Sequence, residues 1–93
     1  MSHDESEAAR PFTPVVIEKD RVGKLRAISS VREAAECLLS DWPQKGRGPG
    51  HKRAIKACLD GLAGLITPED ARHAFIAAAQ EVGIFVRALA RKG

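Results

Sequence analysis

The chain has 93 residues, of which 44% are hydrophobic and 29% charged, and a formal net charge of +3. This length favours one small domain with a modest core. No apolar run approaches the roughly 20 residues that cross a bilayer, so we expect no membrane-spanning helix. No signal-peptide pattern opens the chain, so we expect a cytoplasmic protein whose two cysteines stay reduced.

Positive charge is concentrated in one segment of the chain. Residues 44–56 contain five basic residues and no acidic residue, whereas the rest of the chain carries a net charge of −2. The net charge alone implies no partner, but a local cluster of this kind is typical of a contact surface or a solvated face.

Residues 1–11 are polar and acidic without a periodic pattern, which predicts a disordered tail. A single α+β domain is expected over residues 12–90, followed by a frayed basic tail over 91–93.

Two short strands are predicted over residues 14–19 (Pro-Val-Val-Ile-Glu-Lys) and 24–29 (Lys-Leu-Arg-Ala-Ile-Ser). Residues 20–23 suit a hairpin turn, because Gly23 can adopt a positive φ. In the second strand apolar residues alternate with basic residues such as Arg26, so we expect the basic face to be open to water.

A capping box predicts the start of the first helix. Ser30 can accept a hydrogen bond from the amide of Glu33, and the Glu33 carboxylate can reach back. The helix is expected to end near Trp42, because Pro43 disfavours helical geometry in the residue before it. The predicted apolar stripe comprises Val31, Ala34, Ala35, Leu38, Leu39 and Trp42.

Two further helices are predicted after a glycine-rich loop. The second covers about residues 51–63 and is stopped by Gly64, with an apolar stripe of Ile55, Cys58, Leu59 and Leu62. The third begins after Thr67, which can cap it, with Pro68 in the first helical position.

The end of the domain has two interpretations. Gly83 can terminate the third helix and leave residues 84–86 as a short strand, or the helix can continue through Gly83 to residue 90 at a cost of about 1 kcal/mol. We favour the strand, because a two-stranded hairpin alone is marginally stable in water.

The predicted fold is therefore α+β in the order ββααα(β), with three helices over one face of a small sheet as a two-layer domain. A sheet this small has an open edge, so strand pairing in a homodimer is one possible form of assembly.

The same residues resemble a known family. The segments that carry the resemblance are Pro-Val-Val at 14–16, residues 30–39, Trp-Pro at 42–43, residues 57–60 and residues 71–79. Together they are similar to domain-of-unknown-function family 982, over about residues 12–86. The resemblance implies a small bacterial, alphaproteobacterial, cytoplasmic protein and a single domain, and it brings no functional residues with it.

The candidate binding site is the basic loop and the helix start that follows it. Glycines there can turn backbone N–H groups toward an anion at the start of the second helix. Cations are unfavourable at this end of a helix, and a bound anion would relieve that conflict. The predicted contact residues are Trp42, Lys45, Arg47, Gly48, Gly50, His51, Lys52, Arg53 and Lys56. The alternative is a solvated loop that binds nothing.

Nucleic acid is a second possible partner for the same residues. The second and third helices resemble a helix-turn-helix only coarsely, and the third opens with Glu69 and Asp70, where phosphates would lie. No aromatic residues alternate with the basic ones, so a stacking platform for single strands is poorly supported.

No catalytic residue, metal site or cofactor is predicted, and an enzyme is disfavoured without being excluded. Cys37, Cys58, His51 and His73 lack the close ligand pair typical of structural zinc sites. The cysteines are better interpreted as small buried side chains. His51 is expected in a mobile loop or a fraying helix end and His73 near a helix surface.

Trp42 is interpreted first as a core anchor, since aromatic residues dominate the apolar content of small cores. The alternative is an exposed anchor for a partner. The function expected from the sequence is a small non-enzymatic binding or regulatory module for an anionic protein or nucleic acid. A structural homodimer without a ligand site and a small-anion binder are the alternatives.

Overall fold

The computed structural model describes residues 11–18, 25–84 and 86–88. The predicted order of two strands, three helices and a last strand is confirmed. Residues 1–10 of the predicted tail, the hairpin turn at 20–23 and the end at 91–93 lie outside the described residues. The predicted tail extends to Pro11, but Pro11 is the first residue of β1. The elements are β1 (Pro11–Glu18), β2 (Leu25–Ser30), α2 (Val31–Ser40), the 3-10 turn η1 (Gln44–Gly46), α3 (Pro49–Leu62), α4 (Pro68–Glu81) and β3 (Val86–Ala88).

The sheet has the strand order β2-β1-β3, with both neighbours antiparallel to the central β1. Val15 of β1 is paired with Ile28 of β2 on one side and with Ala88 of β3 on the other. The predicted third strand therefore exists, two residues later than expected. The rival continuous helix is wrong, because Gly83 adopts φ +80° and turns the chain back toward the sheet.

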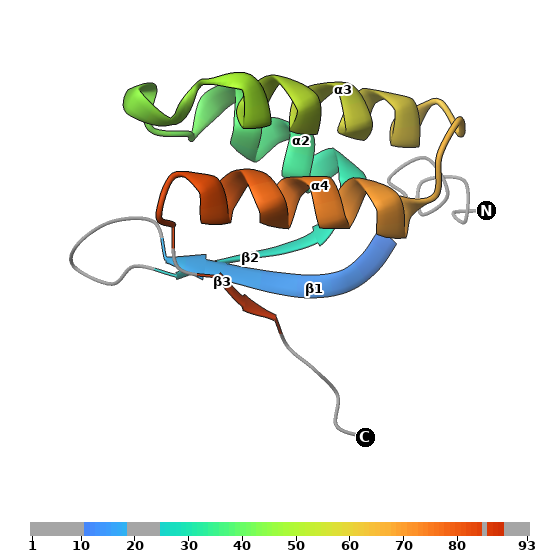
Figure 1. The fold of residues 1–93 in the computed structure, drawn as a ribbon. Coiled ribbons are helices and arrows are strands. Elements are labelled where there is room, and N and C mark those ends of the chain that lie inside the picture. Colours follow the sequence, from blue (N-terminus) through green and yellow to red (C-terminus); the bar gives the residue numbers. More distant parts are fainter. Residues whose placement is uncertain (1–10, 19–24, 85, 89–93) are drawn as a thin grey trace.

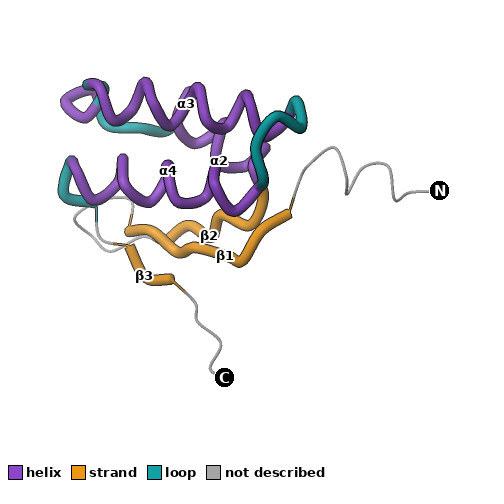
Figure 2. The backbone as a smooth tube through the Cα atoms, turned by 45° about the vertical axis from the view of Figure 1, so that its right-hand side comes forward, coloured by secondary structure: helices purple, strands orange, loops and turns teal. Residues whose placement is uncertain are grey.

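The three helices lie on one face of the sheet, and no described element covers the other face (Figure 1). α2 packs on β2 and α4 packs on β1 and β3, whereas α3 packs against α4 and α2. Figure 2 shows α3 on the side of α4 that is away from the strands. A two-layer domain is therefore an incomplete description, because α3 forms a further layer above α2 and α4.

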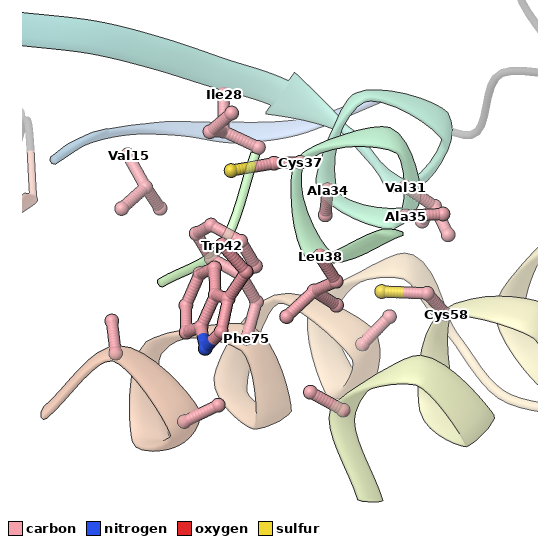
Figure 3. Close-up of a cluster of buried hydrophobic side chains, with 14 of the residues drawn as sticks. Val15, Ile28, Val31, Ala34, Ala35, Cys37, Leu38, Trp42, Cys58 and Phe75 are labelled. Carbon is pink, nitrogen blue, oxygen red and sulfur yellow. The ribbon is translucent and has the colours of Figure 1, made fainter. Parts of the chain in front are cut away.

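One continuous core lies between the sheet and the helices (Figure 3). Its largest fully buried side chains are Phe75, Ile28, Leu38, Val15, Val31, Cys37 and Cys58. Trp42 and Phe75 lie together in this cluster, with ring centroids 5.7 Å apart and an edge-to-face tilt of 64°. This geometry is one of those that aromatic pairs prefer.

The predicted caps are present. The Ser30 hydroxyl accepts from the amide of Glu33 at 3.1 Å, and the Thr67 hydroxyl accepts from the amide of Asp70 at 3.1 Å. Glu33 reaches back one residue further than a standard capping box, because its carboxylate accepts from the amide of Ser29 at 2.7 Å. This bond joins the end of β2 to the start of α2.

The faces of β2 are the reverse of the expectation. Arg26 points to the helix side, where its guanidinium donates to the Asp41 carboxylate at 3.1 Å at the end of α2. Leu25 and Ala27 are exposed instead, on the face that no described helix covers. The ion pair with Asp41 explains why Arg26 can lie on the helix side, because the carboxylate balances the charge of the guanidinium there.

Two leucines predicted to be core residues are also exposed. Leu39 of α2 is 55% exposed and Leu59 of α3 is 52% exposed. The buried face of α3 is formed instead by His51 and four small residues, namely Gly50, Ala54, Cys58 and Gly61. A Cβ on Gly61 would lie 3.3 Å from both Val31 and Ala71, so the absence of a side chain there permits close helix packing.

Candidate functional site: the basic segment between α2 and α4

Trp42 anchors the start of the basic segment in the core. Its side chain is only 4% exposed, which confirms the interpretation of this residue as a core anchor. The indole Nε1–H donates to the carbonyl of Gly46 at 3.0 Å and so closes η1 beneath the ring. A direct contact of the Trp42 ring with a partner would therefore need this core to open.

His51 is buried, so the expectation of a mobile histidine is wrong. The side chain lies in the first turn of α3, and its ring centroid is 5.8 Å from that of Trp42. The His51 Nε2 lies 2.7 Å from the carbonyl oxygen of Leu38. A carbonyl only accepts, so Nε2 carries the proton and donates. Leu38 is one of the last four residues of α2, whose carbonyls lack partners within that helix.

The end of α2 gathers basic side chains around it. Arg47 donates from its guanidinium to the carbonyl of Trp42 at 3.0 Å, and Arg26 pairs with Asp41 there. Basic groups are favourable at a helix C-terminus, where the dipole is negative. Arg47 is exposed, but it also has a structural role, because it satisfies a backbone carbonyl just beyond the end of α2. An open hollow of about 260 Å³ adjoins this end, lined by Ser40, Asp41, Trp42 and Pro43.

Two of the glycines in the segment lie against the end of α4, and Gly46 is needed for packing there. A Cβ on Gly46 would lie 2.9 Å from Cγ1 of Val82, and a Cβ on Gly50 would collide with the carboxylate of Glu81. Gly48 differs, because a Cβ there would meet nothing within 4 Å. At Gly46 the structure thus shows a requirement for close approach to Val82, whereas at Gly50 the carboxylate of Glu81 could move aside.

Glu81 is the residue that the sequence reasoning missed. It ends α4, and its carboxylate lies against Gly50 in the first turn of α3. It also forms an ion pair with Arg53 at 3.6 Å. A carboxylate is favourable at the positive end of a helix. The charge conflict that motivated the predicted anion site is therefore relieved within the chain.

The signal that could have found Glu81 is helix length. α3 and α4 each contain 14 residues and are joined by a short turn, in which Gly64 has φ +82°. When two antiparallel helices have equal length, the last residue of the second helix lies beside the first turn of the first helix. The contact of Gly61 with Ala71 at the opposite end agrees with this register.

The five basic side chains of the segment are all exposed: Lys45, Arg47, Lys52, Arg53 and Lys56. We call this set the basic surface. Lys56 forms an i,i+4 ion pair with Asp60 at 2.9 Å, and the lysine side chain of this pair is exposed. Among the described residues, Lys45 and Lys52 form no ion pair.

Cys37 and Cys58 are both fully buried and form no disulfide, and their burial confirms their interpretation as small buried side chains. Burial raises the pKa of Cys58 from 9.0 to about 12, with a further contribution from Cys37. A thiol with so high a pKa is not a nucleophile at neutral pH, because the thiolate is the reactive form.

Within the described part of the chain, no group of three or more His, Cys, Asp or Glu residues is placed to hold a metal ion. His73 is 66% exposed and lies 3.6 Å from Glu69, which confirms its surface position. None of the described helices is long and apolar enough to cross a membrane.

The geometry of α3 and α4 does not match a helix-turn-helix. That motif joins its helices at about 90–120°, whereas these two run side by side along their whole length (Figures 1 and 2). Glu69 is paired with Arg72 at 2.8 Å, and Arg72 also donates to the carbonyl of Thr13 in β1 at 2.9 Å. The start of α4 is thereby tied to the sheet.

We expect Gly48→Asp to raise the free energy of unfolding by about 0.5–1 kcal/mol. Gly48 is the N-cap of α3, with an extended φ of −98°, and has no side chain to accept from the first turn. An Asp would fit because the space around its Cβ is open. Urea unfolding followed by circular dichroism measures the change. Gly48→Ala is the control, and a gain equal to that of Asp would contradict the capping account.

A family model described as Protein of unknown function (DUF982) matches residues 13–86. Neither the search of the curated proteins nor the search of the solved structures found a match. The matched range extends from the third residue of β1 to the first residue of β3 and includes the whole basic surface. Since the match covers most of the chain, this protein belongs to the DUF982 family.

Proposed function

We propose that this protein is a small non-enzymatic binding module, which contacts an anionic partner through the basic surface. One observation supports the proposal above the others. Five basic side chains are exposed along η1 and the outer face of α3, although the backbone beneath them is held in place by Trp42, His51 and Glu81. A rigid backbone reduces the entropy lost on binding.

Solvent-exposed ion pairs within the surface do not prevent binding. The pairs of Arg53 with Glu81 and of Lys56 with Asp60 are on the surface. Such pairs contribute only about 0–1 kcal/mol each, so a partner's carboxylates or phosphates can replace them at little cost. We further propose a bacterial cytoplasmic setting, where Cys37 and Cys58 remain reduced.

We expect Lys45→Gln combined with Lys52→Gln to weaken binding to polyglutamate and to single-stranded RNA by roughly ten-fold at about 50 mM salt. These two lysines form no ion pair among the described residues, so their loss should spare the fold. Backbone amide shifts of residues 44–56 in an NMR titration report the binding.

The matched control is Thr13→Glu with Ala77→Glu, which lowers the net charge by the same two units at exposed positions of β1 and α4. It should retain most of the affinity. Unchanged titrations for the lysine variant, or equal losses for both variants, would overturn the basic surface as the binding site.

A homodimer is the second candidate, supported by the open edge of β2. This strand lies at one side of the sheet, and among the described strands it is flanked only by β1. Leu25, 54% exposed, lies on the uncovered face beside that edge. We expect Leu25→Lys to lower the sedimentation coefficient at high micromolar concentration to that of a monomer. A wild-type protein already monomeric at that concentration would remove this candidate.

A further inference from the structure

We infer that the partner presents an acidic amphipathic helix, which docks along the outer face of α3 with its apolar side on Leu59 and Leu39. This inference rests on the proposed function and names the chemistry of its partner. The docking surface consists of Lys52, Lys56 and Leu59 on α3 and Leu39 on α2.

The α3 part of this surface is one stripe. Lys52, Lys56, Leu59 and Ala63 recur at i, i+4, i+7 and i+11, a spacing that places side chains along one side of a helix. All four are exposed. The stripe is therefore basic at its start and apolar at its end.

Leu39 adds a second exposed leucine from the neighbouring helix. On α2 it lies two residues, about 200° around the helix, from Cys37. The buried Cys37 lies beside Ile28 of β2 (Figure 3), so Leu39 is turned away from the sheet. It follows Leu38, whose carbonyl is bound by His51, and Lys52 follows His51 in α3. Leu39 is thus close to the basic end of the stripe.

Charge and apolarity together select the occupant. Two leucines that are each more than half exposed gain from burial against apolar side chains, which phosphates cannot provide. Lysines beside them are complementary to carboxylates. An amphipathic helix with acidic residues flanking an apolar stripe offers both, in the i, i+3, i+4 pattern of helix recognition.

Nucleic acid fits the surface less well. Single strands need exposed aromatic side chains for stacking, and Trp42, Phe75 and His51 are all buried. Recognition of a phosphate by the start of α3 is also disfavoured, because the Glu81 carboxylate already lies there.

The test uses two synthetic peptides of about four helical turns. Both carry the same glutamates, and one has leucines along one face where the other has serines. We expect the full chain to bind the leucine peptide at least roughly ten-fold more tightly than the serine peptide, as measured by calorimetry.

Leu59→Ser should remove this difference and leave the affinity for the serine peptide unchanged. Leu65→Ser is the matched control, because Leu65 is 73% exposed but lies in the turn between α3 and α4. It should change neither affinity.

Two results would overturn the inference alone: equal affinity for both peptides, or tighter binding to a single-stranded or duplex oligonucleotide of equal charge. Failure of the proposed function is distinct. In that case no anionic probe binds, or binding does not depend on Lys45 and Lys52.

Discussion

Trp42→Ala is expected to lower the free energy of unfolding by about 3–5 kcal/mol, the usual cost of removing a buried aromatic ring. The ring is 4% exposed and contacts Phe75 and His51. Its Nε1–H also holds the carbonyl of Gly46. The loss is a large fraction of the 5–15 kcal/mol typical of a domain. Urea unfolding followed by circular dichroism measures it, since the chain has only one tryptophan to report fluorescence.

Trp42→Phe distinguishes the contribution of the buried ring to stability from that of its hydrogen bond. Phenylalanine retains most of the apolar volume but leaves the Gly46 carbonyl without its donor, at a cost of about 1–3 kcal/mol if that carbonyl remains buried. Hydrogen exchange at Gly46 and Gly50 should become faster in both variants. A loss below about 1 kcal/mol for Trp42→Ala would contradict its role in the core, because such losses are typical of surface substitutions.

Local signals in the sequence predict most of the fold. Ser30, Thr67 and Gly83 determine where helices begin or end, and each acts as expected from its own chemistry. These features depend on residues within one turn of each other. They are therefore readable without knowledge of the tertiary structure.

Long-range contacts are what the sequence does not reveal. Arg26 faces the helices because Asp41 is there, and Glu81 lies against Gly50 because α3 and α4 have equal lengths. Leu59 is exposed because Gly61 and Cys58 occupy the packed face of α3. Apolar periodicity locates the helices along the chain. It does not determine which way each helix is turned about its own axis, so a residue at the border of the apolar stripe can lie inside or outside the core.

The candidate site illustrates the same limit. The sequence predicts a flexible glycine-rich loop in which a bound anion would relieve a charge conflict, with a solvated loop as the alternative. In the structure Gly46 and Gly50 are packed against α4, and His51 and Arg47 bind the end of α2. The exposed lysines are the part of the prediction that depends on composition alone, and they are the part on which the proposed function depends.

Raising the pH from about 9 to about 12 should destabilise the wild-type protein more than Cys58→Ala. Burial raises the pKa of Cys58 from 9.0 to about 12, so the folded state keeps the thiol proton over a range in which the unfolded state loses it. Stability from this group is therefore complete below pH 9 and is lost as the pH rises toward 12. The slope is up to about 1.4 kcal/mol per pH unit.

The measurement is urea unfolding of both proteins at several pH values. Removing the Cys58 sulfur costs some packing at every pH, so the difference in slope between the two proteins isolates the titration of this thiol. The chain has no tyrosine, which removes one other group that would titrate in this range. Parallel curves for wild type and Cys58→Ala would show that the thiol is not held in an apolar environment, because an exposed thiol has the same pKa in both states.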